Sequence, residues 1–116
     1  MLALHDSTFR LQSNSTSGTA DGHTQLTFRE ADGLLTAVYA GGTVQHGHAV
    51  TRWLSEDSLE MLYHAVNRDG RLQAGAAVAR FFDRDDGLEM VLDWKWLNTG
   101  AGESGQSVWE LVKPSR

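Results

Sequence analysis

The sequence predicts an all-β fold, an eight-stranded antiparallel β-barrel of up-and-down topology. The first observation is the segment Leu88 to Leu97, in which every second residue is a large apolar side chain and the residues between are mostly charged. The second is a series of such segments joined by tight-turn sequences, such as Asp32-Gly33 and Gly41-Gly42. The third is the composition, with 12 glycines and one proline. Because a meander of eight strands hides its edges by closing on itself, we expect a barrel.

Each strand is expected where apolar positions alternate between turn residues. In chain order the expected strands are Thr8 to Ser13, Thr24 to Glu30, Leu34 to Ala40, Thr43 to Leu54, Ser58 to Val66, Leu72 to Phe82, Leu88 to Leu97 and Gln106 to Val112. Asn14 to Gly22 and Asn98 to Ser104 are expected to be loops, because they are rich in Gly, Ser, Thr and Asn. Ser55 to His64 offers an alternative, a short helix capped by Ser55, although this segment leads directly into a strong hairpin signal.

The turn after the fifth expected strand decides which side chains share a face. Asn67-Arg68-Asp69-Gly70 fits a type I turn followed by a left-handed glycine that makes a bulge. In that register Tyr63 lies opposite Gly75, so that an aromatic ring covers a strand glycine. A two-residue Asp-Gly loop would shift the pairing by one residue and exchange the faces, and the sequence leaves both registers open.

Length and composition limit the classes of function. At 116 residues the chain is expected to form a single β-barrel domain, residues 1–116. A net charge of -5 with scattered Lys and Arg argues against a nucleic-acid partner. With no cysteine, disulfides and thiolate metal sites are excluded. The N-terminus lacks the pattern of a signal peptide and no apolar stretch is long enough to span a bilayer, so we expect a cytoplasmic protein without a membrane partner.

Several short motifs together carry a family resemblance. They are Val38-Tyr39-Ala40-Gly41-Gly42, Leu59-Glu60-Met61-Leu62-Tyr63 with Val66-Asn67, Gly70-Arg71-Leu72-Gln73-Ala74-Gly75, Trp94-Lys95-Trp96 and Ser104-Gly105. From about Phe9 to Glu110, the chain resembles a group of short uncharacterised bacterial proteins that are sometimes labelled N-acetylglutamate synthase. Where folds are known in that group, they look like lipocalin or avidin-type barrels. The resemblance therefore implies a calycin-type barrel.

The label of that group implies an acetyl-CoA site. Such a site needs a glycine loop that opens a helix, whose backbone amides bind the pyrophosphate. Arg71 to Ala76 has its glycine one position late for that motif and falls in an expected strand. The sequence also shows no nucleophile elbow, phosphate loop or Ser–His pair at a recognisable spacing, so we assign no catalytic residue.

The large aromatic side chains are the candidate ligand-binding residues. An eight-stranded barrel is either filled by side chains or leaves room for one small ligand, and Trp and Tyr suit both roles because their polar tips need partners when buried. The residues that we expect to contact a ligand are Tyr39, Tyr63, Trp94, Trp96, Trp109 and His64. Among them Tyr63, Trp94 and Trp96 are the ones expected to reach the cavity.

Two histidines are the metal candidates of the sequence. His46 and His48 stand at positions i and i+2 of an expected strand, which places both imidazoles on one face. No third ligand is evident nearby, although His64 or Glu110 could approach through the fold, and surface histidines are the alternative interpretation. Asp83 to Asp86 resembles a calcium loop, but its glycine and distal glutamate are out of register, so we interpret it as an acidic turn. No cofactor is expected.

The leading functional hypothesis is a barrel that binds a small, partly apolar or aromatic ligand in its interior. The first alternative is a filled barrel that acts as an interaction module and forms a homodimer, for example through the strand Thr43 to Leu54. The second alternative is a small enzyme that depends on His46 and His48.

Overall fold

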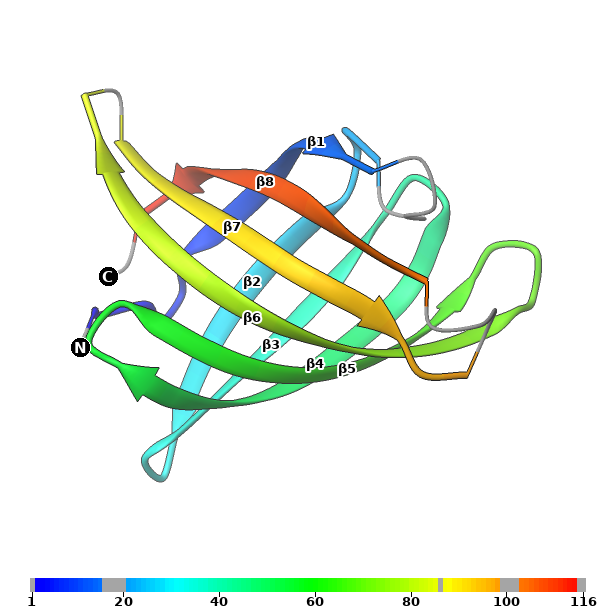
Figure 1. Ribbon diagram of the computed structural model, residues 1–116, viewed down its shortest axis with the longest axis horizontal. Helices are drawn as coiled ribbons and strands as arrows, with labels where there is room; N and C mark the ends of the chain where they lie inside the picture. Colours follow the sequence, from blue (N-terminus) through cyan, green and yellow to red (C-terminus); the bar gives the residue numbers. More distant parts are fainter. Residues whose placement is uncertain (1, 16–20, 86, 99–102, 115–116) are drawn as a thin grey trace.

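The computed structural model describes residues 2–15, 21–85, 87–98 and 103–114, which form one closed barrel of eight antiparallel strands. Each strand pairs with the next along the chain, and the last pairs with the first (Figure 1). The strands are β1 (Thr8–Asn14), β2 (Gln25–Ala31), β3 (Leu34–Gly41), β4 (Val44–Ser55), β5 (Ser58–Asn67), β6 (Leu72–Arg84), β7 (Gly87–Trp96) and β8 (Ser104–Lys113). The predicted all-β, up-and-down barrel is confirmed.

The observed strands start and end within two residues of the expected ones, because turn residues set both limits. Asp32 and Gly33 both have positive φ, 55° and 76°, as a two-residue hairpin of the primed type requires. The alternative helix at Ser55 to His64 is wrong. The Ser55 hydroxyl instead hydrogen-bonds within the tight turn between β4 and β5, to Asp57 at 2.9 Å and to Ser58 at 2.6 Å.

The register between β5 and β6 agrees with the bulged turn. Gly70 has a positive φ of 87°, and its N–H donates to the carbonyl of Asn67 at 2.9 Å. Tyr63 is the cross-strand partner of Gly75, as the bulged register predicts. The two-residue alternative, which would have turned Tyr63 outward, is therefore wrong.

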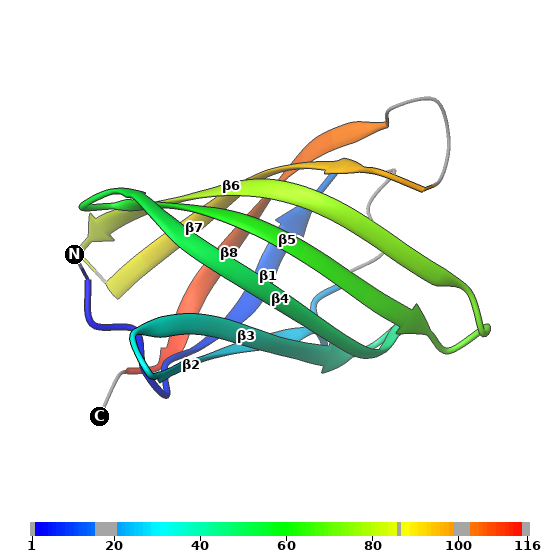
Figure 2. The ribbon, with the colours of Figure 1, turned by 90° about the horizontal axis from the view of Figure 1, so that it is seen from below.

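One end of the barrel is closed by aromatic packing. Phe9, Phe28 and Phe81 are all buried, and their ring centroids lie 5.9 to 6.3 Å apart in edge or tilted contacts. Leu4 of the N-terminal segment is only 2% exposed and belongs to the same core. Figure 2 shows this N-terminal segment at the same end of the barrel as the turn between β4 and β5. The core therefore fills the barrel from this end.

The inner face of β7 carries the side chains that its alternation predicts. Met90, Leu92 and Trp94 are buried in the hydrophobic core, and Leu88 and Trp96 pack against it. Val91 points to the outer face, yet it is only 8% exposed. Its cross-strand partners are Arg80 and Val108, so its burial comes from neighbouring strands rather than from its own sequence.

The outer face of β7 is polar, as expected, and its two carboxylates are paired with side chains of other strands. Asp93 accepts hydrogen bonds from Arg80 at 2.7 Å and from Gln106 at 3.0 Å. Glu89 accepts one from Arg84 at 3.0 Å. Among the residues that the structure describes, no helix has the length and apolar character needed to cross a membrane.

Candidate functional site

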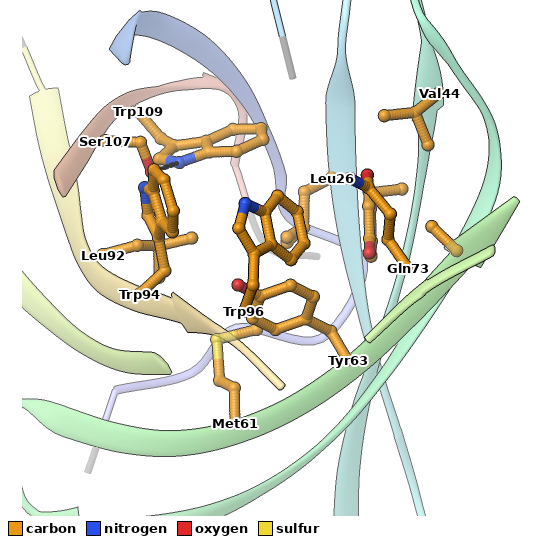
Figure 3. Close-up of a pocket in the computed structure, with 12 residues that line it drawn as sticks. Leu26, Val44, Met61, Tyr63, Gln73, Leu92, Trp94, Trp96, Ser107 and Trp109 are labelled. Carbon is orange, nitrogen blue, oxygen red and sulfur yellow. Dashed lines mark hydrogen bonds between the residues drawn. The ribbon is translucent and has the colours of Figure 1, made fainter. Parts of the chain in front are cut away.

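A cavity lies inside the barrel at the end opposite the phenylalanine core. Its free space, including the opening to solvent, is about 580 Å³. The lining is mostly apolar, and five aromatic side chains provide much of it: Tyr39, Tyr63, Trp94, Trp96 and Trp109. Figure 3 shows Trp94 and Trp109 together on the left of the view and Trp96 at its centre, with Tyr63 below Trp96. The lining also includes the polar side chains of Gln73 and Ser107.

Three of these aromatic side chains each cover a glycine on the neighbouring strand. In every case the two residues are direct cross-strand partners, and a Cβ added to the glycine would collide with the ring. The three pairs are Tyr39 over Gly47, Tyr63 over Gly75 and Trp94 over Gly105. Because each ring occupies the place of a missing side chain, it lies against the barrel wall. This arrangement leaves the centre of the open end free.

The cavity rings also contact one another in a row along the wall. Tyr39 and Tyr63 have ring centroids 6.3 Å apart, in an edge arrangement. Tyr63 and Trp96 follow at 6.0 Å, and Trp96 and Trp94 at 5.5 Å. Such contacts limit the rotamers of each ring, so the cavity has a firm aromatic wall.

Hydrogen bonds fix two of the indoles. Trp94 Nε1 donates to Asn14 Oδ1 at 3.2 Å, and Trp109 Nε1 donates to Ser107 Oγ at 2.9 Å. Each bond satisfies the polar edge of a buried indole and orients its ring. The faces of these rings are therefore available for apolar contact in the cavity.

The two tyrosine hydroxyls are polar groups in an apolar environment. Burial raises the pKa of Tyr39, and the neighbouring Tyr63 raises it further. Burial likewise raises the pKa of Tyr63. Both phenols are neutral at physiological pH, and the raised pKa keeps them neutral to a higher pH than an ordinary tyrosine. Within the described part of the chain neither hydroxyl makes a hydrogen bond, so each can donate one to a ligand.

A pair of amides lies beside the cavity. Asn67 Nδ2 donates to Oε1 of the lining residue Gln73 at 2.8 Å. Asn67 is only 6% exposed, and its Oδ1 is a buried acceptor without a hydrogen-bond partner among the described residues. A buried acceptor of this kind costs free energy, and a rotation of the two amides could exchange which atom is unpaired.

The structure brings together five of the six residues that the sequence analysis selected. Tyr39, Tyr63, Trp94, Trp96 and Trp109 all line the cavity. Their role in binding a ligand stays a prediction. His64 does not line the cavity. It is exposed on the outer face, where it pairs across strands with His48.

Sequence reasoning missed several lining residues and two of the covered glycines. Met61 and Ser107 share the inner face of their strands with Tyr63 and Trp109, whereas Gln73 lies on β6, which carries none of the predicted aromatics. Counting every second residue from Tyr63 or Trp109 would have found Met61 and Ser107. Gly47 and Gly105 could have been found only from the pairing between strands, which turn lengths determine.

The predicted metal candidates lie outside the cavity. His46 is exposed and His48 is partly buried, and both are on the outer face of β4. Across residues 2–15, 21–85, 87–98 and 103–114, no group of three or more His, Asp or Glu side chains could hold a metal ion. Asp83 lies in β6 and Asp85 in the turn that follows it, whereas Asp86 of the predicted acidic turn falls outside the described residues.

A comparison with protein-family models gives one match, described as avidin-like protein, over residues 2–112. The chain belongs to the avidin-like family. No curated protein and no solved structure matches the chain. The match spans almost the whole avidin-like barrel, including every residue that lines its cavity. Family membership confirms the avidin-like part of the expected resemblance and supports small-ligand binding in general.

Proposed function

We propose that this avidin-like barrel binds a small, partly apolar ligand in the cavity at its open end. The observation that carries the proposal is the set of rings that lie over glycines, because it keeps space open where side chains would otherwise fill the barrel. Concave, mostly apolar sites with a few polar groups are typical of small-molecule binding. The family to which the chain belongs supports the same function.

The lining indicates which ligand groups would be favoured. The faces of Trp94, Trp96 and Trp109 offer apolar contact to a flat or aliphatic group. The neutral hydroxyls of Tyr39 and Tyr63 offer directional hydrogen bonds to an acceptor. The ligand that we propose therefore combines an apolar body with at least one polar group.

The test is a titration of tryptophan fluorescence with a panel of metabolites, fatty acids and biotin, a ligand of avidin-like proteins. Trp96→Phe removes an indole from the cavity, so we expect it to weaken or abolish a saturable signal. Trp53→Phe is the matched control, because Trp53 packs on Phe81 in the closed end and does not line the cavity. A panel without any saturable response, or an equal effect of both variants, would contradict the proposal.

The homodimer is a second candidate, favoured by one observation on the outside of the barrel. Val38, Val50, Leu62 and Val78 are 37% to 54% exposed on neighbouring strands and form an outer apolar face. Pairing of two chains through the edge of β4 is not available, because β3 and β5 occupy both of its edges. A homodimer would therefore use this outer apolar face.

Sedimentation of the purified chain tests this candidate. Leu62→Lys places a charge at the centre of the outer apolar face, where Leu62 pairs with Val50, and should convert a dimer to monomers. Leu97→Lys is the control, since Leu97 is similarly exposed but lies beyond the end of β7. A wild-type chain that sediments as a monomer at high concentration would exclude the homodimer.

Nothing in the position of His46 and His48, outside the cavity, favours the enzyme alternative.

A further inference from the structure

Two histidines face each other on the outer surface of the barrel. His48 of β4 and His64 of β5 are direct cross-strand partners, and their ring centroids lie 5.7 Å apart with an angle of 41° between the planes. The metal pair predicted from the sequence is His46 with His48, and His64 enters it only as a residue that could approach through the fold. His46 lies on the same face, but its cross-strand partner is Val66.

The separation of the two rings fits the binding of one metal ion. A nitrogen ligand lies about 2.0–2.1 Å from Zn²⁺, which places the ion about 3.2 Å from the centre of the imidazole. Two such rings would have centres about 5.2 Å apart at a tetrahedral angle and about 6.4 Å apart on opposite sides of the ion. The observed 5.7 Å lies between these limits, so the separation of the two rings is compatible with one ion between them.

The surroundings leave both imidazoles accessible and place no charge directly across from either. The other cross-strand neighbour of His48 is Val38, and that of His64 is Ala74. His64 is exposed and His48 is partly exposed. No third His, Asp or Glu among the described residues is placed to complete a ligand set. Water would therefore fill the remaining positions around an ion.

We propose that His48 and His64 form a surface site for a divalent transition metal that prefers imidazole nitrogen, such as Zn²⁺. Imidazole suits Zn²⁺, Cu²⁺ and Ni²⁺, whereas Mg²⁺ and Ca²⁺ prefer oxygen ligands. The ion joins β4 to β5 on the outside of the barrel. Gly47 precedes His48 in the chain and lies under the ring of the cavity residue Tyr39. Tyr63 precedes His64 and itself lines the cavity. A bound ion therefore links two strands that carry residues of the cavity wall.

The experiment is a calorimetric titration of the full, tag-free chain with ZnCl₂ near neutral pH, with MgCl₂ as the comparison ion. We expect one Zn²⁺ to bind per chain and no Mg²⁺. His48→Gln and His64→Gln should each weaken binding by about tenfold or more, since even the loss of an outer-shell partner of a metal ligand costs about 10–100-fold. Two variants are used so that the result does not depend on one of them folding, and unfolding without metal is measured for both.

His46→Gln is the matched control, because it removes an exposed histidine from the same face of the same strand. Its Zn²⁺ affinity should stay within about twofold of the wild type, since a ligand that the ion does not use contributes nothing to the site. An equal loss in all three variants would show adventitious binding and overturn the proposal. So would full affinity in His48→Gln or His64→Gln, or the absence of Zn²⁺ binding by the wild-type chain.

Discussion

Tyr63 lies directly across the sheet from Gly75, and its ring occupies the space where a side chain of residue 75 would stand. Gly75 has Trp96 as its partner on the other side, and the Tyr63 and Trp96 rings contact each other at 6.0 Å between centroids. A single residue without a side chain thus lets two cavity rings meet over β6.

Gly75→Ala should therefore reduce both stability and the free space of the cavity. The added methyl group collides with Tyr63, which must swing into the cavity or push β5 away from β6. Overpacking of this kind costs about 1–3 kcal/mol in the free energy of unfolding. Urea unfolding measures the loss, and the fluorescence titration should show weaker ligand binding.

Gly22→Ala is the control for that change, because a Cβ at Gly22 has nothing within 4 Å and its φ is not positive. Its stability should stay within about 0.5 kcal/mol of the wild type, as at most surface positions. If Gly75→Ala were as stable as Gly22→Ala and bound ligand equally well, the covering of Gly75 by Tyr63 would not support the cavity.

The barrel could be predicted from the sequence because its signals are local. Alternation with a period of two residues and turn pairs such as Asp32-Gly33 define strands without knowledge of the partner strand. The contact of Tyr63 with Gly75 could also be predicted, as one of two possible registers, because both residues belong to one hairpin whose turn has a recognisable sequence.

The rest depends on pairing that the sequence does not display. The pairing between β4 and β5 shifts register between Trp53 and Ser55, next to the turn, so the meeting of His48 with His64 cannot be counted from the turn alone. Likewise Val91 is buried on the outer face by Arg80 and Val108, which come from two other strands. Whether the barrel is open or filled also depends on all eight strands at once, because three of the cavity rings lie over glycines of neighbouring strands.

The two tyrosines of the chain should not ionise at their ordinary pKa while the protein is folded. Tyr39 and Tyr63 are the only tyrosines, and burial raises the pKa of both above the ordinary 10.0. The near-ultraviolet absorbance of phenolate should therefore stay low through pH 10 in the folded chain and rise near pH 10 in denaturant.

Linkage gives the direction of the effect on stability. The pKa of both tyrosines is raised in the folded chain. The contribution of their neutral hydroxyls to the free energy of unfolding is therefore fully present below pH 10 and is lost as the pH rises above it. Alkaline unfolding and phenolate formation should thus occur together. A folded chain that forms phenolate near pH 10 would show that the hydroxyls are open to solvent and would contradict their burial.

The amides of Asn67 and Gln73 should behave as a unit. Gln73→Leu removes the acceptor of Asn67 Nδ2 and leaves the whole buried amide of Asn67 without that partner. We expect a loss of about 1–3 kcal/mol in the free energy of unfolding. Asn67→Leu combined with Gln73→Leu should recover part of it, since no buried amide is then unpaired. Losses that simply add in the double variant would contradict the coupling.

Leu4→Ala should destabilise the barrel without changing the cavity. Leu4 is 2% exposed and packs in the core at the closed end, so its truncation should cost about 2–5 kcal/mol in unfolding free energy. The carbonyl of Leu4 accepts from both the N–H and the hydroxyl of Ser7, and these bonds do not depend on its side chain. The N-terminal segment should therefore keep its path, and ligand affinity at temperatures where the variant is folded should equal that of the wild type.

Urea unfolding and the fluorescence titration, done on the same samples, separate the two effects. A ligand affinity that falls with stability would mean that the closed end and the cavity are mechanically coupled through the strands.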